Sequence, residues 1–259
     1  AFIGAGNMAT ALIGGLLADG TPAQNIIASD PDPIRLDAMI GHGIRSTPDN
    51  QQAVEHADIV VLAVKPQMLK SIAEQLSQSV QSRRPLILSI AAGIRAETLS
   101  NWLGGDLPVV RSMPNTPAML QSGATGLYAT PLVSESQKQL AESVMRAVGL
   151  TRWVDNEDLM DAVTAVSGSG PAYFFLVMEA MQEAAEQLGL DAESARLLTL
   201  QTALGAARMA IESPEPPATL RARVTSPGGT TEQAINSLEQ DNLRDCFARA
   251  LHAARDRSV

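Results

Sequence analysis

The spacing of hydrophobic residues divides the chain into two parts. Over residues 1–155, short apolar runs alternate with stretches in which apolar residues recur at helical spacing. We expect strands at 1–3, 25–29, 58–64, 85–90, 108–112, 126–130 and 151–154, and helices at 8–19, 68–78 and 136–148. Continuous apolar strands separated by helices predict a mostly parallel sheet with helices on both faces.

Residues 156–259 show only the helical pattern and predict an all-α domain. The expected helices are 157–166, 172–188, 192–211 and 243–256. Residues 161–211 are apolar nearly all round, and such helices must be buried on several sides. We therefore favour an intertwined homo-oligomer over a monomeric helical bundle.

Composition excludes several classes of function. The 259 residues are 45% hydrophobic, which is enough for a substantial core, and the net charge is −9. An acidic surface repels nucleic acids and anionic lipid, so we expect neither as a partner. Cys246 is the only cysteine, which permits no internal disulfide and favours a reducing cytoplasm. No apolar run is long enough to cross a bilayer, and because the chain opens at Ala1 inside a strand, we expect the native start to lie upstream.

The first expected strand runs directly into the stretch GAGNMA. Gly4, Gly6 and Ala9 fill the pattern GxGxxG/A between a strand and a helix. Gly4 permits a tight turn, Gly6 lets a pyrophosphate approach the backbone, and the phosphates lie at the positive helix end. This context favours a Rossmann dinucleotide site over an ordinary turn.

The identity of the dinucleotide rests on Asp30, which ends the second strand. An acid there binds the ribose 2′-hydroxyl and indicates NAD(H). Arg35 could instead face the 2′-phosphate of NADPH, and Asp30 could simply cap a helix that begins at Pro31 or Pro33. Both cofactors therefore stay open.

Three further strand ends carry candidate ligand-binding loops: AVKP (63–66), SIAAG (89–93) and MPNTP (113–117). The carboxyl ends of parallel strands form the usual ligand crevice. Lys65 could meet the cofactor or be an ordinary solvated lysine, and MPNTP could be only a stiff turn.

The helical half offers little acid–base chemistry. It contains no lysine, and its only histidine is His252 near the C-terminus. Many dehydrogenases of hydroxy acids need such a group to manage a proton on oxygen. A protonated imine already carries its positive charge, so hydroxyl and backbone donors suffice to position it.

Two stretches of the helical half could supply those donors. SGSGPAYFF (167–175) interrupts a helical pattern with glycines, which could equally serve close helix packing. VTSPGGTTEQAI (224–235) exposes consecutive N–H groups, and we expect Thr230 or Thr231 to cap a helix that begins near Glu232. Such a loop at a helix N-terminus can bind a small carboxylate. A plain turn between helices would account for some of these residues but not for all of them.

The motifs IGAGNMA, AVKPQ, SIAAGI, MPNTPA, DAVTAVSGSGPAYFF and VTSPGGTTEQAI occur in this order over nearly the whole chain. Together they closely resemble the pyrroline-5-carboxylate reductase family. The resemblance implies NAD(P)H-dependent reduction of 1-pyrroline-5-carboxylate to L-proline, the last step of proline biosynthesis. It also implies a helical domain interlocked with a partner subunit, with dimers often assembling into decamers. We expect no metal site.

The resemblance also assigns site residues. It implies that the carboxylate of the substrate rests on Ser226, Gly228, Gly229 and Thr230, that the hydroxyl of Thr231 acts at the ring nitrogen, and that Glu157 lies near the substrate. The cofactor positions it implies are Gly4, Ala5, Gly6, Asn7, Met8, Asp30, Asn50, Ala63, Val64, Lys65, Pro66, Ala91, Ala92 and Gly93. Asp30 and Arg223 stand where some relatives carry other residues.

Three alternatives remain from the sequence. A β-hydroxyacid dehydrogenase shares the two-part plan but needs a lysine in the helical half. A reductase of a related cyclic imine would differ in pocket size. A dinucleotide-binding scaffold without activity would leave VTSPGGTTEQAI unexplained.

Overall fold

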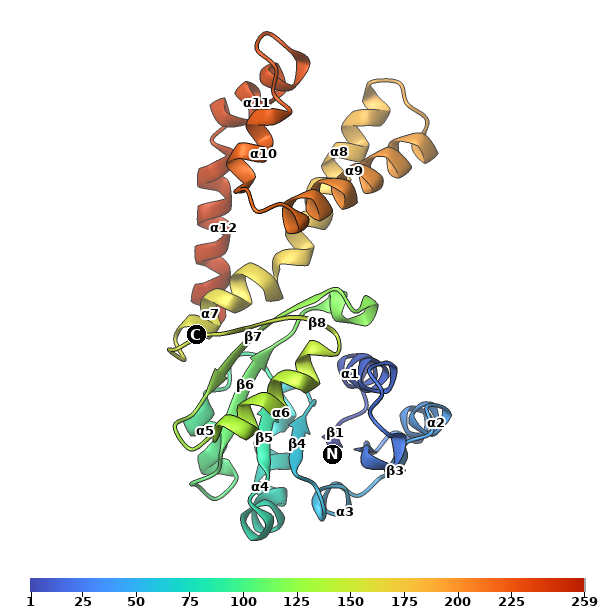
Figure 1. Ribbon diagram of the computed structural model, residues 1–259, viewed down its shortest axis with the longest axis vertical. Helices are drawn as coiled ribbons and strands as arrows, with labels where there is room; N and C mark the ends of the chain where they lie inside the picture. The colour runs from blue at the N-terminus through green and yellow to red at the C-terminus, as the bar shows by residue number, and fades with distance from the viewer. Residues whose placement is uncertain (259) are drawn as a thin grey trace. The chain divides into compact units, whose positions relative to one another are not determined.

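The computed structural model describes residues 1–258. Contacts divide these residues into two compact units, Ala1–Ser169 together with the residues from Ala254 on, and Gly170–Ala253 (Figure 1). Residues 156–169, which we assigned to the helical domain, thus pack with the first unit. Within the described residues no helix is both long and apolar enough to cross a membrane.

The first unit is built on an eight-stranded sheet in the order β3-β2-β1-β4-β5-β6-β7-β8. The strands are β1 (Phe2–Ile3), β2 (Ile27–Ser29), β3 (Arg45–Thr47), β4 (Ile59–Leu62), β5 (Leu86–Ser89), β6 (Val109–Met113), β7 (Gly123–Ala129) and β8 (Gly149–Trp153). Only β6 and β7 pair antiparallel. The expected, mostly parallel sheet is confirmed, while β3 escaped detection because its sequence, RST, is short and polar.

Helices cover both faces of this sheet (Figure 1). They are α1 (Asn7–Ala18), α2 (Pro33–Gly41), α3 (Asn50–Val54), α4 (Pro66–Arg83), α5 (Ala96–Trp102), α6 (Glu135–Arg146) and α7 (Leu159–Val163), joined by short turns at Ala23–Asn25 and Thr116–Leu120 and followed by a π-helical segment, Thr164–Gly168. Val61 of β4 packs in one core cluster with α1 and α6, whereas its neighbours Val60 and Leu62 pack in the other with α4 and α5. This alternation explains the continuous apolar run, because each successive side chain enters a different core.

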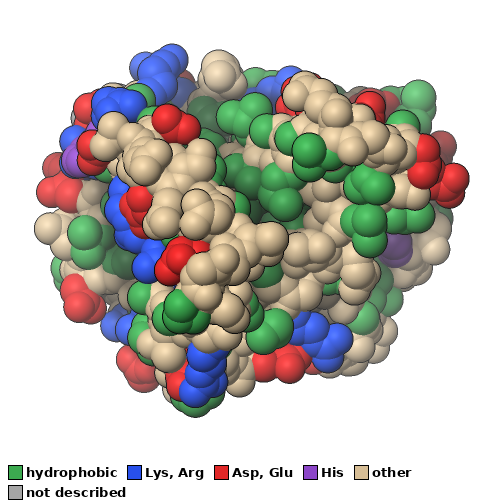
Figure 2. Space-filling model, turned by 90° about the horizontal axis from the view of Figure 1, so that it is seen from above, with side chains coloured by type: hydrophobic (Ala, Val, Ile, Leu, Met, Phe, Trp, Pro, Cys, Tyr) green, Lys and Arg blue, Asp and Glu red, His purple; other side chains and the backbone are tan. Residues whose placement is uncertain are grey.

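The second unit contains only helices: α8 (Gly170–Gln187), α9 (Ala192–Glu212), α10 (Pro217–Arg223), α11 (Thr230–Gln240) and most of α12 (Leu243–Ser258). Many of its large apolar side chains are exposed, including Phe174, Phe175 and Leu176 of α8 and Leu204 and Ile211 of α9. The face of the molecule seen in Figure 2 carries hydrophobic side chains in contiguous patches. A single copy of this unit therefore lacks a covered core.

One expected helix cap and one expected helix start need correction. Helix α2 begins at Pro33, and its cap is Asp32, whose side chain accepts from Ile34 N–H, so Asp30 does not cap it. Helix α11 begins at Thr230, and its cap is Gly229, with no side-chain cap bond. The expectation that Thr230 or Thr231 caps a helix beginning near Glu232 is therefore wrong, because both threonines already lie in the first turn.

Candidate active site

A cavity of 1020 Å³ opens at the carboxyl ends of β1 to β5. It brings together every expected cofactor residue except Gly93. The lining includes Gly4, Ala5, Gly6, Asn7, Met8, Asp30, Asn50, Ala63, Val64, Lys65, Pro66, Ala91 and Ala92. These residues follow five strands, β1 to β5, and parallel pairing of these strands places all five connections at one edge of the sheet.

The glycine loop has the shape that a dinucleotide phosphate requires. Gly4 has φ +97°, and a Cβ there would lie 2.6 Å from the carbonyl oxygen of Ala63, so both conformation and space demand glycine. A Cβ at Gly6 would meet no protein atom within 4 Å. The space beside Gly6 is therefore open toward the cavity.

Two helix N-termini contribute to this cavity. Helix α1 begins at Asn7 and helix α4 at Pro66, and neither has a side-chain cap bond or an acidic residue in its first turn. Uncapped N–H groups and the positive end of the helix dipole attract anions. The cavity thus provides a fitting site for a pyrophosphate.

Asp30 is engaged by the protein itself. One carboxylate oxygen, Oδ2, accepts from Ala5 N–H at 2.9 Å and from Arg35 Nη1 at 3.3 Å, and the other, Oδ1, accepts from Asp32 N–H at 2.9 Å. The residue is only 4% exposed. Asp30 therefore fixes the glycine loop to the end of β2.

The serine hydroxyls at the ends of β2 and β5 hold two other parts of the lining. The Ser29 hydroxyl donates to Asn50 Oδ1 at 2.7 Å, and Ala91 N–H donates to the Ser89 hydroxyl at 3.3 Å. Gly93 has φ +73°, which favours glycine, but it does not line the cavity. Its expected cofactor contact stays a prediction.

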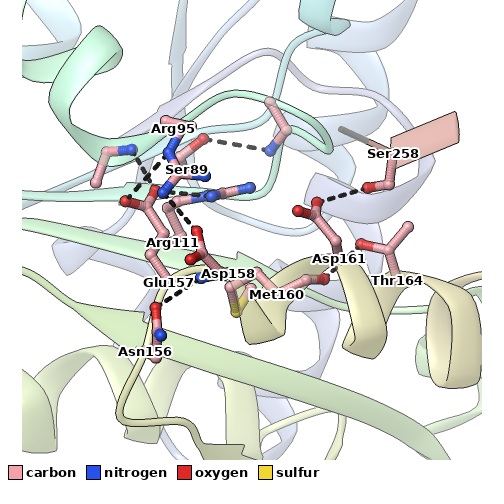
Figure 3. Close-up of polar contacts among 12 residues, drawn as sticks. Ser89, Arg95, Arg111, Asn156, Glu157, Asp158, Met160, Asp161, Thr164 and Ser258 are labelled. Carbon is pink, nitrogen blue, oxygen red and sulfur yellow. Dashed lines mark hydrogen bonds and ion pairs between the residues drawn. The ribbon is translucent and has the colours of Figure 1, made fainter. Parts of the chain in front are cut away.

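Glu157 is bound by several protein donors (Figure 3). Its Oε1 accepts from Arg111 Nη1 at 2.7 Å and from Ala96 N–H at 2.6 Å, while Arg95 Nε lies 3.8 Å from its Oε2. The side chains of Arg111 and Glu157 are 7% and 13% exposed. Glu157 thus joins β6 to the start of α5, and contact with a substrate is a separate prediction.

The structure adds Arg111 to the residues that the sequence singled out. It lies on β6, where a charged residue interrupts the apolar run PVVRS. A charged residue inside a buried strand was the feature of the sequence that could have pointed to it. In the same network Arg95 Nη2 donates to Asp158 Oδ1 at 2.7 Å, and this bond raises the pKa of the Arg95 guanidinium. The Ser258 hydroxyl donates to Asp161 Oδ1 at 2.9 Å nearby (Figure 3).

The loop 224–231 lies in the second unit and forms a tight turn before α11. Gly228 has φ +71°, Gly229 N–H donates to the Ser226 carbonyl at 3.0 Å, and Gly228 N–H donates to Glu232 Oε2 at 2.8 Å. The N–H groups of Thr230 and Thr231 have no acceptor within residues 1–258. These two adjacent donors can bind an external carboxylate.

The residues before this loop form an ion pair. Arg223 of α10 donates to Glu215 Oε1 at 2.6 Å, and both side chains belong to the second unit. The guanidinium is therefore already neutralised in this structure.

Within the described residues no group of acidic, histidine or cysteine side chains is arranged to hold a metal ion.

Comparison with protein families assigns both parts of the chain. The model for the pyrroline-5-carboxylate reductase dimerisation domain matches residues 157–259. A model described as NADP oxidoreductase, coenzyme F420-dependent, matches residues 1–93. The two matches correspond to the helical and dinucleotide-binding patterns of the sequence.

Individual relatives match over the full length. The pyrroline-5-carboxylate reductase of Pseudomonas aeruginosa is 54% identical over 100% of this chain and 95% of its own, and that of Vibrio alginolyticus is 49% identical over 98% and 94%. A solved pyrroline-5-carboxylate reductase from Coxiella burnetii superposes with a TM-score of 0.96 at 50% identity, covering 99% of this chain and 96% of its own.

More distant structures share the fold alone. A 3-hydroxyisobutyrate dehydrogenase from Mycobacterium tuberculosis reaches a TM-score of only 0.51 at 18% identity, covering 99% of this chain and 91% of its own. Since the close matches span both units, the chain belongs to the pyrroline-5-carboxylate reductase family.

Proposed function

We propose that this protein reduces 1-pyrroline-5-carboxylate to L-proline with a hydride from NADH or NADPH. The observation that carries the proposal is identity of up to 54% to named pyrroline-5-carboxylate reductases over the whole chain. The open cavity at the glycine loop and the unsatisfied donors at the start of α11 supply two binding sites that this reaction needs.

The chain's own residues would hold the dinucleotide in the cavity of the first unit. The N–H groups at the starts of α1 and α4 would receive the pyrophosphate, and Lys65 adds a positive charge at the cap position of α4. The backbone of Ala91 and Ala92 would line the nicotinamide end, where small side chains permit close approach. When bound, the reduced nicotinamide supplies the hydride.

The substrate carboxylate would bind at the loop 224–231. Gly229 N–H is committed to the Ser226 carbonyl and Gly228 N–H to Glu232, so the free donors are those of Thr230 and Thr231. A carboxylate at a helix N-terminus is further stabilised by the helix dipole. Ser226 and Gly228 would then shape the turn.

The hydroxyl of Thr231 would orient the ring nitrogen of the imine. A protonated imine carries its own positive charge, and reduction at carbon leaves the nitrogen as a neutral amine before it takes up a proton from water. No strong acid is needed at the site, which agrees with a helical half that lacks lysine. A positioned hydroxyl and backbone donors are sufficient.

We further propose that the helical unit forms an interlocked dimer, and that dimers assemble into decamers. The support is the match of residues 157–259 to a dimerisation domain and the exposed apolar side chains of α8 and α9. A reductase without membrane or nucleic-acid partners would work in the cytoplasm.

A labelling experiment tests the proposed reaction. The protein would be incubated with 1-pyrroline-5-carboxylate and a reduced dinucleotide carrying deuterium at the transferable position. Mass spectrometry of the product should find proline with one deuterium at the former imine carbon. Unlabelled proline, or no proline, would refute the proposal.

A further inference from the structure

Three charged side chains gather where the chain leaves β2 and enters α2. Asp30 and Arg35 line the cavity at the glycine loop, and Asp32 stands between them in the sequence. In a Rossmann domain this position lies beside the adenosine ribose of a bound dinucleotide. The 2′ position of that ribose carries a hydroxyl in NADH and a phosphate in NADPH.

Arg35 is held by both carboxylates. Its Nη1 lies 3.3 Å from Asp30 Oδ2, and its Nε lies 3.5 Å from Asp32 Oδ2. The side chains of Arg35 and Asp32 are 52% and 44% exposed, so neither charge is buried. Arg35 lines the cavity itself, and Asp32 holds it from the side. Two carboxylates and one guanidinium leave this cluster with one net negative charge.

Asp30 cannot turn away to admit an anion. Its two oxygens accept from the N–H groups of Ala5 and Asp32, and the residue is 4% exposed. Displacing it would leave a buried carboxylate without its donors and would release the glycine loop. Among the residues that line the cavity, the only other cation is Lys65, which belongs to the β4–α4 connection.

A phosphate monoester carries a charge of about −1.5 to −2 at neutral pH. Next to the cluster it would meet a net negative charge, because two carboxylates already outweigh the positive charge of Arg35. A ribose hydroxyl is neutral and can donate a hydrogen bond to the acceptor capacity that Asp30 Oδ1 retains. We propose that Asp30, Asp32 and Arg35 together make this protein select NADH over NADPH.

The inference rests on the proposed function only in requiring a bound dinucleotide, so binding alone tests it. Dissociation constants for NADH and NADPH would be measured without substrate by titration calorimetry of the full chain. Wild type should bind NADH about 10-fold more tightly than NADPH at low salt, because the extra phosphate is repelled at short range. Tighter binding of NADPH would overturn the inference and identify Arg35 as a phosphate ligand.

Two variants remove one negative charge each. Asp32→Asn keeps the backbone N–H that binds Asp30 and keeps a side chain able to cap α2, so it should fold and should raise NADPH affinity several-fold relative to NADH. Asp30→Ser should shift the ratio further, toward NADPH. Asp37→Asn, which removes the same charge from an exposed position of α2 outside the cavity, is the matched control and should leave the ratio unchanged.

An unchanged ratio in both Asp32→Asn and Asp30→Ser would contradict the inference. If neither dinucleotide binds wild type, the proposed function fails instead. If both bind and 1-pyrroline-5-carboxylate is reduced while NADPH is preferred, only the inference about the cluster fails.

Discussion

At the scale of single residues, Thr231 carries the most specific chemical assignment. Its hydroxyl was expected either to cap α11 or to act on the substrate. The structure places the cap at Gly229 and gives Thr231 no capping bond, so its hydroxyl makes no side-chain contribution to the helix start. A substitution there can therefore be interpreted through the chemistry.

We expect Thr231→Ala to lower kcat by about 10–100-fold, as is typical for loss of one positioned polar group in a transition state. Thr231→Ser keeps the hydroxyl and should retain most of the rate. Steady-state kinetics of the two variants, with circular dichroism to verify helix content, make the measurement. If the alanine variant were as fast as wild type, the Thr231 hydroxyl would have no catalytic role.

The motifs predicted which residues line the cavity better than they predicted what those residues contact. Gly4, Asn50, Lys65 and Ala91 follow strands, and parallel strands necessarily bring their ends together. The contacts of Asp30 depend on how its carboxylate turns toward Ala5 N–H, which local sequence does not encode. For the same reason the pairing of Glu157 with Arg111, 46 positions apart, could not be expected.

At the scale of elements, the Arg111–Glu157 pair joins β6 to the segment that begins the family's helical domain. Removal of one partner of a buried ion pair leaves a charge without compensation and typically costs about 3–5 kcal/mol. We therefore expect Arg111→Met to lower the free energy of unfolding, as measured in urea titrations. The loss should lie at the lower end of that range, because Glu157 keeps Ala96 N–H and Arg95 as partners.

Arg95→Gln is the matched control for this pair. Arg95 is 54% exposed, and exposed ion pairs contribute about 0–1 kcal/mol. Equal losses in both variants would mean that the burial of Arg111 does not determine the stability of this junction.

Glu142 links α6 to β8 and should give the stability a pH dependence. Its carboxylate accepts from Trp153 Nε1 at 3.1 Å and also from Arg146 and Thr151, and these bonds, that of Trp153 first, hold the pKa of Glu142 below its usual value of 4.5. A lowered pKa in the folded state stabilises above 4.5, and the contribution is lost as pH falls through the lowered value.

Wild type should therefore be more stable than Glu142→Gln at neutral pH, and the difference should shrink as the pH falls below about 4.5. Chemical denaturation at a series of pH values measures it. A difference that is constant with pH would show that the ionised form of Glu142 is not what stabilises the junction.

The elements that were not expected are short or polar. Strand β3 reads RST, and helices α3 and α10 have five and seven residues, too few to show a helical period. The long helices α8 and α9 were expected within about two residues of their observed bounds, whereas α4 runs on to Arg83, well past its expected end at residue 78. Short elements are fixed by their contacts rather than by their own pattern.

At the scale of the whole molecule, the exposed apolar residues of the helical unit require a partner. Phe174 of α8 and Leu204 of α9 are 68% and 61% exposed, and they are two of many exposed large apolar side chains in this unit. A monomeric protein rarely exposes so many apolar side chains together. The family model that covers them describes a dimerisation domain. Burial between copies would supply the core that one copy lacks.

We expect Leu204→Asp to dissociate the dimer, because a charge would be buried in an apolar interface. Analytical ultracentrifugation of the variant should show monomer or aggregate at concentrations where wild type is oligomeric. Leu132→Asp, an equally large change at an exposed position outside residues 157–259, should leave the assembly intact. Retention of the wild-type assembly by Leu204→Asp would exclude this face from the interface.

The central claim is reduction of a five-membered cyclic imine, and initial rates test it most directly. The purified protein would receive 1-pyrroline-5-carboxylate, its six-membered homologue and a hydroxy acid in separate assays, each with the dinucleotide in the oxidation state that the reaction needs and in both NAD and NADP forms. We predict rapid oxidation of the reduced dinucleotide with 1-pyrroline-5-carboxylate, a lower kcat/KM with the larger ring, and no turnover of the hydroxy acid. Turnover of the hydroxy acid without reduction of either imine would contradict the account.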